Sequence, residues 1–139
     1  MNTSRAINNS LRQKPLVLLI LPLAFLVMGA KWVEKPVQDL ETIVGKWRGS
    51  GITSAGSTFD VGYVFRKDGS LDGWAAGSGW SKKLQSPPGT MHINAGKLEY
   101  RNDNGILRTG VLYEDKKGRR KIKFEGETGG TWDVRPVKK

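Results

Sequence analysis

The sequence lacks cysteine altogether, contains one histidine (His92) and has no acidic residue before Glu34. The absence of cysteine excludes disulfides, thiol nucleophiles and cysteine-ligated metals, and a single histidine excludes multi-histidine metal sites. The sequence also has no G-x-S-x-G motif, phosphate-binding loop or dinucleotide fingerprint. We therefore expect neither an enzyme nor a cofactor or metal site. A hydrolase with paired carboxylates stays open, because strands bring distant residues together.

Only one long apolar run is present, from Leu16 to Ala30, and it follows three basic residues and no acidic one. A cationic start, an apolar core and a small-residue exit such as Gly29-Ala30 are the parts of a secretory signal peptide. A retained membrane anchor is the alternative, since the exit lacks a clean A-x-A. A helix over this run reaches only about 22 Å, short of the roughly 30 Å hydrocarbon core. Both interpretations predict an extracytoplasmic protein that is secreted, periplasmic or anchored to the membrane.

We expect three segments along the chain. Residues 1–30 form the signal peptide or N-terminal membrane anchor, and residues 31–40 form a tether in which Pro36 stops any continuous helix. Residues 41–139 are enough for one domain and too few for two. This domain begins with a short predicted helical turn, for which Asp39 is the N-cap.

Beyond this turn, the chain consists of short segments in which apolar and polar residues alternate, separated by residues typical of turns. No segment there shows the apolar spacing of a helix of useful length. In Thr58–Arg66, for example, Phe59, Val61, Tyr63 and Phe65 share one face. Such spacing predicts an all-β fold, a small antiparallel up-and-down barrel of about eight strands, because a closed sheet has no exposed edges. A sandwich and a half-open sheet are the alternatives. The turn pairs are Asp68-Gly69, Ala95-Gly96, Asn104-Gly105, Lys117-Gly118 and Gly129-Gly130.

Gly45-Lys46-Trp47 follows the helical turn and opens the first strand of the predicted domain. This triplet resembles the G-x-W signature of the lipocalins and related calycins, and the chain looks like the short lipocalin-like domains of bacterial exported proteins. The resemblance implies a β-barrel in which Trp47 plugs the closed end and a basic residue from a late strand packs across its indole. Arg135, in the last predicted strand, matches that basic residue, and such stacking is stabilising.

The domain is rich in aromatic residues for its size. Four of them are candidates to line a cup for an apolar or ring-bearing ligand, the usual use of a barrel mouth: Tyr63, Trp74, Trp80 and Trp132. The alternative is that most of them fill the interior, as aromatic residues of a small domain must. Trp80 lies in a Gly/Ser-rich stretch that suits a mobile loop at the open end.

Basic residues outnumber acidic ones by 23 to 13, which favours anionic partners. Five of them surround the predicted Gly118 turn: Lys116, Lys117, Arg119, Arg120 and Lys121. This hairpin is a candidate contact for an anionic membrane or envelope polymer, or else a solvated turn whose charges discourage edge pairing. Nucleic acid is not the expected partner, because an exported protein meets lipid and envelope polymers first.

The sequence thus predicts an exported, non-enzymatic binding protein. We expect a small apolar molecule or lipid in the β-barrel cup and an anionic surface at the basic hairpin. The alternative is a filled barrel without a cavity that docks another macromolecule in the cell envelope.

Overall fold

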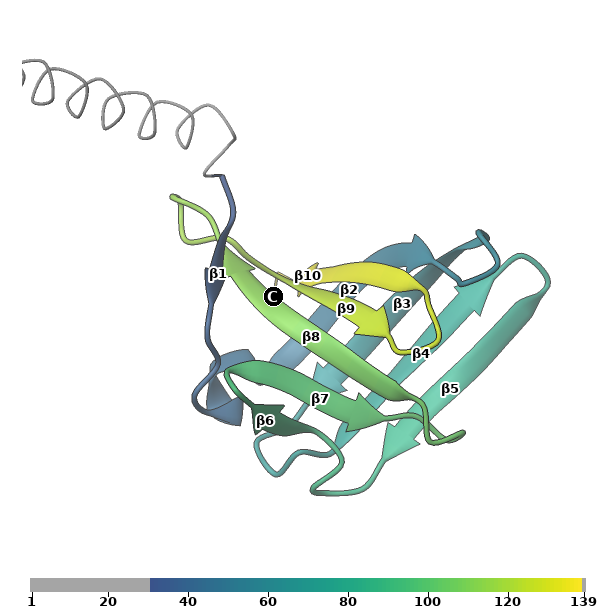
Figure 1. Ribbon diagram of the computed structural model, residues 1–139, viewed down its shortest axis with the longest axis horizontal. Helices are drawn as coiled ribbons and strands as arrows, with labels where there is room; N and C mark the ends of the chain where they lie inside the picture. Colours follow the sequence, from purple (N-terminus) through teal and green to yellow (C-terminus); the bar gives the residue numbers. More distant parts are fainter. Residues whose placement is uncertain (1–30, 139) are drawn as a thin grey trace, which may run out of the picture. The chain divides into compact units, whose positions relative to one another are not determined.

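The computed structural model describes residues 31–138, whose arrangement is shown in Figure 1. The predicted signal or anchor segment, residues 1–30, lies outside this range. Within residues 31–138, no helix is long and apolar enough to cross a membrane. The elements in this range are β1 (Val33–Lys35), a 3-10 helix η1 (Leu40–Ile43), β2 (Gly45–Ile52), β3 (Thr58–Phe65), β4 (Leu71–Gly77), β5 (Trp80–Ser86), β6 (His92–Asn94), β7 (Lys97–Arg101), β8 (Leu107–Glu114), β9 (Arg120–Gly126) and β10 (Thr131–Pro136).

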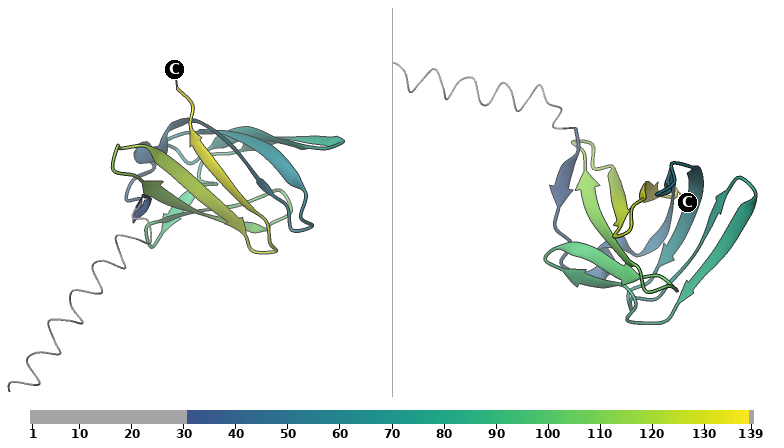
Figure 2. Two further views of the ribbon diagram at one scale, coloured as in Figure 1. Left: turned by 90° about the horizontal axis from the view of Figure 1, so that it is seen from above. Right: turned by 45° about the vertical axis from the view of Figure 1, so that its right-hand side comes forward.

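The all-β, antiparallel prediction is confirmed. One sheet contains all ten strands: nine follow the order β5-β4-β3-β2-β10-β9-β8-β7-β6, β1 pairs with β8 beside this path, and every pairing is antiparallel. Neighbours along this path are consecutive in the chain except at β2 and β10, which pair from Trp47 opposite Pro136 to Ile52 opposite Thr131. The sheet curls strongly, as the two views of Figure 2 show.

The sheet is a half-barrel, because β5 and β6 are consecutive in the chain but do not pair. The segment between them bonds elsewhere: the Gly89 amide donates to the Asp68 carbonyl and the Met91 amide to the Gly69 carbonyl, both at 2.8 Å. These bonds carry the chain across to the β3–β4 turn and bury Met91. The predicted strand order is therefore present, while the sheet stays open between its two edge strands.

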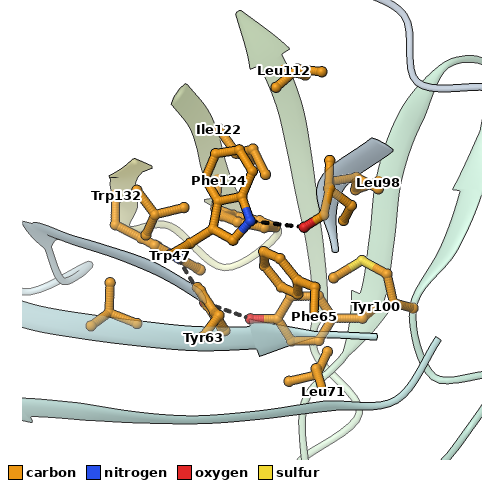
Figure 3. Packing of buried hydrophobic residues seen from close by; sticks show 14 of the residues in the cluster. Trp47, Tyr63, Phe65, Leu71, Leu98, Tyr100, Leu112, Ile122, Phe124 and Trp132 are labelled. Atoms are coloured by element: carbon orange, nitrogen blue, oxygen red, sulfur yellow. Dashed lines mark hydrogen bonds between the residues drawn. The ribbon is translucent and has the colours of Figure 1, made fainter. Parts of the chain in front are cut away.

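One face of the curled sheet carries a single apolar core. Val61, Tyr63 and Phe65 alternate inward along β3, as predicted, and Ile122 and Phe124 do so along β9. Figure 3 shows the core around Trp47, with labels on Tyr63, Phe65, Leu71, Leu98, Tyr100, Leu112, Ile122, Phe124 and Trp132. Val37, Ile43 and Met91 belong to the same core. We call the Trp47 end of the half-barrel, which this core fills, its closed end.

The segment predicted to be a tether belongs to the fold from Val33 onward. β1 pairs with the last part of β8, where Val33 lies opposite Glu114, whereas β7 pairs with β8 only up to Gly110. β1 thus covers the part of the β8 edge that β7 leaves unpaired. Val37 is buried, and its amide donates to the Gly96 carbonyl at 2.8 Å. Residues 33–35 therefore add a strand to the sheet, and Val37 adds a side chain to the core.

Candidate functional site

A cavity of about 240 Å³ lies inside the half-barrel, on the side away from Trp47. It lies at the open side of the half-barrel, where alternate residues of β5 from Trp80 to Ser86 line it together with Tyr100 of β7 and Asp103. Apolar side chains from β3, β4 and β5 form most of one wall: Phe59, Val61, Leu71, Ala75 and Leu84. The sheet therefore encloses a cup with an apolar wall and an open side.

Three hydrogen-bonded aromatic residues lie side by side in the cavity wall. Trp132 Nε1 donates to Tyr63 Oη at 2.9 Å, and the Tyr63 and Tyr100 hydroxyl oxygens are 2.9 Å apart (Figure 3). Burial, the largest cause, raises the pKa of Tyr63 well above its ordinary value and also raises the pKa of Tyr100. Both phenols are thus neutral at ordinary pH and act as hydrogen-bonding groups.

Arg108 is one of the charged residues in the cavity wall, and the sequence reasoning missed it. Its guanidinium carbon lies 5.1 Å from the centroid of the Trp132 ring. Gly126, opposite Arg108 on β9, leaves the room for this side chain, because a Cβ there would collide with the Arg108 guanidinium. The signal was available: Arg108, Gly110 and Leu112 share one face of β8, and the latter two are buried.

Trp80 and Lys82 lie on the β5 side of the cavity. Trp80 is the first residue of β5 rather than part of a loop, is 42% exposed, and packs with its ring centroid 6.3 Å from that of Phe59. Lys82 Nζ lies 3.6 Å from Asp103 Oδ2, so this ion pair lies at the open side of the half-barrel. Of the four predicted cup residues, Tyr63, Trp80 and Trp132 line the cavity.

Trp74 does not line the cavity, which corrects the prediction for this residue. Trp74 is three positions from the buried Leu71, and residues an odd number apart point to opposite faces of a strand. Its indole lies on the outer face against Gly62, where a Cβ would come within 2.6 Å of Trp74 Nε1. Arg48 covers the ring at 5.5 Å from its centroid, and the side chain stays 37% exposed.

Trp47 is buried at the closed end, and its Nε1 donates to the Ile43 carbonyl at 2.8 Å. The basic residue over its ring is Arg120 of β9, 5.2 Å from the ring centroid, and not the expected Arg135. Trp132 and Val134 point inward along β10, so Arg135 points outward. The prediction for Arg135 is therefore wrong, and Arg120 occupies that place.

The positive charge of the basic hairpin between β8 and β9 is partly neutralised by Asp115, an acidic residue of the same hairpin. Asp115 is buried and accepts hydrogen bonds from the Lys117 and Arg119 amides at 2.9 Å and from Arg119 Nε at 2.6 Å. Burial raises the pKa of the Asp115 carboxyl, but these hydrogen bonds outweigh it and hold that pKa below its usual value. Lys121 Nζ lies 3.8 Å from Asp133. Lys116 and Lys117 at the tip are exposed, and no ion pair is found for either within residues 31–138.

The carboxylates and the single histidine do not gather into a site. In the part of the chain that the structure describes, no three His, Asp or Glu side chains lie close enough together to hold a metal. His92 is exposed, with Nε2 3.3 Å from the Glu99 carboxylate on the neighbouring strand.

Comparison with known proteins adds no further identification. No family model matches the chain, and neither a curated protein nor a solved structure matches it.

Proposed function

We propose that this protein binds a small apolar or amphipathic molecule in the half-barrel cup and does not catalyse a reaction. The observation that carries this proposal is that side chains fill only part of the half-barrel interior. The core is packed around Trp47, whereas a cavity of about 240 Å³ lies beside Tyr100 and Trp132. A cavity costs dispersion contacts that a filled core would keep. A ligand that occupied it would restore those contacts.

The size and wall of the cavity favour one small ligand or one alkyl chain. Its volume lies just below the roughly 300–1,000 Å³ of sites for drug-sized ligands. A mostly apolar wall with a few convergent polar groups is the usual composition of such sites. The alternative, a filled barrel that docks another macromolecule, is less favoured because it needs no interior space.

Binding of an apolar fluorophore, anilinonaphthalene sulfonate, tests the proposal. We expect saturable binding at one site, with quenching of tryptophan emission. Ala75→Phe, which extends into the cavity, should abolish this binding. Ala76→Phe is the matched control, because it adds the same ring to the next residue of β4, on the opposite face of the strand. Binding that survives Ala75→Phe, or that both variants lose equally, would rule out the cup as the site.

Export from the cytoplasm is part of the same proposal and is based on the leader sequence. The basic start and the apolar run from Leu16 to Ala30 support delivery to or through a membrane. The mature chain would then begin near Ala30 or Lys31. The intact mass of the exported protein tests this cleavage, and a full-length species in the membrane fraction would indicate a retained anchor instead.

A further inference from the structure

Among residues 31–138, Arg108 has no acidic partner, although it is a cation in the wall of the cup. The other cation there, Lys82, pairs with Asp103, whereas none of the ion pairs found among residues 31–138 includes Arg108. Its side chain is only partly exposed and lies over Trp132. A charge withdrawn from water is costly unless it is paired. An anion in the cavity would supply the missing partner.

The hydroxyl pair beside Arg108 provides a second donor. Trp132 contributes one N–H, and Tyr63 and Tyr100 contribute one O–H each, while the bonds among them number two. One hydroxyl hydrogen is therefore left over, whichever tyrosine donates to the other. Both tyrosines line the cavity with Arg108. Burial is the largest cause acting on the pKa of both phenols and raises it, whereas the Arg108 charge lowers it.

Two sides of the cavity differ in character. Arg108 and Tyr100 lie on β8 and β7, whereas most of the apolar lining lies on β3, β4 and β5, beside Tyr63 of β3 and Lys82 of β5. A ligand that satisfies both sides has an anionic head and an apolar body. The planar guanidinium fork matches a carboxylate, which accepts two parallel hydrogen bonds.

We propose that the ligand of the cup is a small amphipathic carboxylic acid, whose carboxylate pairs with Arg108 and accepts a hydrogen bond from the Tyr63–Tyr100 pair. This inference rests on the proposed binding function and names its ligand class. The cavity of about 240 Å³ limits the enclosed part to a short chain or a single ring system.

Titration calorimetry of the full chain with octanoate and with 1-octanol tests this inference, because the two ligands share the chain and differ in head-group charge. We expect octanoate to bind more tightly. Arg108→Met keeps the length of the side chain and removes its charge, so it should lower octanoate affinity at least about tenfold and leave octanol affinity unchanged. Arg108→Lys should retain part of the preference for octanoate.

Arg48→Met is the matched control, since Arg48 also covers a tryptophan, Trp74, but lies outside the cavity. It should change neither affinity. If Arg108→Met lowers the affinity for both ligands equally, or leaves octanoate affinity unchanged, the proposed carboxylate site is wrong. The proposal that the cup binds apolar molecules would not be affected. If the parent chain binds neither ligand, both the carboxylate site and the proposed binding function are wrong.

Discussion

The guanidinium of Arg120 covers the Trp47 ring at 5.2 Å from its centroid, and Arg120 Nη1 donates to the Thr42 carbonyl at 2.6 Å. Trp47 Nε1 in turn donates to the Ile43 carbonyl. Since Thr42 and Ile43 belong to η1, these contacts fasten the 3-10 helix, β2 and β9 together at the closed end. Neither Trp47 nor Arg120 lines the cavity, so these contacts lie in the filled part of the half-barrel.

Trp47→Ala should lower the free energy of unfolding by about 3–5 kcal/mol, because it leaves a large cavity in a packed core. Trp74→Ala is the matched control on the outer face, and we expect it to cost far less, since the Trp74 side chain is 37% exposed. Denaturant titration of both variants measures the difference. A loss below about 1 kcal/mol for Trp47→Ala would contradict its role as a buried plug.

Removing residues 1–40 should destabilise the domain relative to removing residues 1–30. The longer deletion takes away β1 and its pairing with β8, together with the fully buried Val37 and the bond from its amide to Gly96. Burial of a valine side chain alone contributes about 1.5–3 kcal/mol. Thermal melts of the two truncated proteins compare them directly. Equal melting temperatures would mean that residues 31–40 are a loose tether after all.

Much of the fold was predictable from local signals. The alternation of apolar and polar residues and the turn pairs predict where the strands lie. Both signals come from residues that are close in sequence. The opening between β5 and β6 was not predictable in this way. It depends on the bonds from Gly89 and Met91 to the β3–β4 turn, which join residues about twenty positions apart.

The errors at the site have a simpler cause, which is the choice of residues by type without regard to strand face. Ile122 and Phe124 point inward, so Arg120 does too, whereas Trp132 and Val134 leave Arg135 outside. The same rule puts Trp74 outside and Arg108 inside. Assigning each residue of a predicted strand to one face would have placed Arg120 rather than Arg135 beside Trp47. It would also have placed Arg108 rather than Trp74 in the cavity wall.

Tyr63 and Tyr100 should not ionise in the folded protein near pH 10, the ordinary pKa of a tyrosine. Burial raises both folded-state pKa values above the unfolded value, so the pair leaves stability unchanged below about pH 10 and reduces it as the pH rises further. Absorbance at 295 nm should show these two phenols ionising together with unfolding. Ionisation of either phenol at pH 10 while circular dichroism stays native would contradict their burial.

The basic hairpin gives the last prediction, which concerns the contact with an anionic surface that the sequence predicts. Arg119 and Arg120 have partners within the protein, so the contact would depend mainly on Lys116 and Lys117. Each basic residue near an anionic membrane contributes about 1 kcal/mol, within a Debye length of about 8 Å at physiological salt. Reversing both lysines to Glu should therefore lower affinity for phosphatidylglycerol vesicles by about thirtyfold or more without unfolding the protein. The control is Arg48→Glu with Lys83→Glu, an equal change in charge on the outer face of β2 and β5. If the two double variants bind vesicles equally well, as measured by co-sedimentation, the hairpin is only a solvated turn.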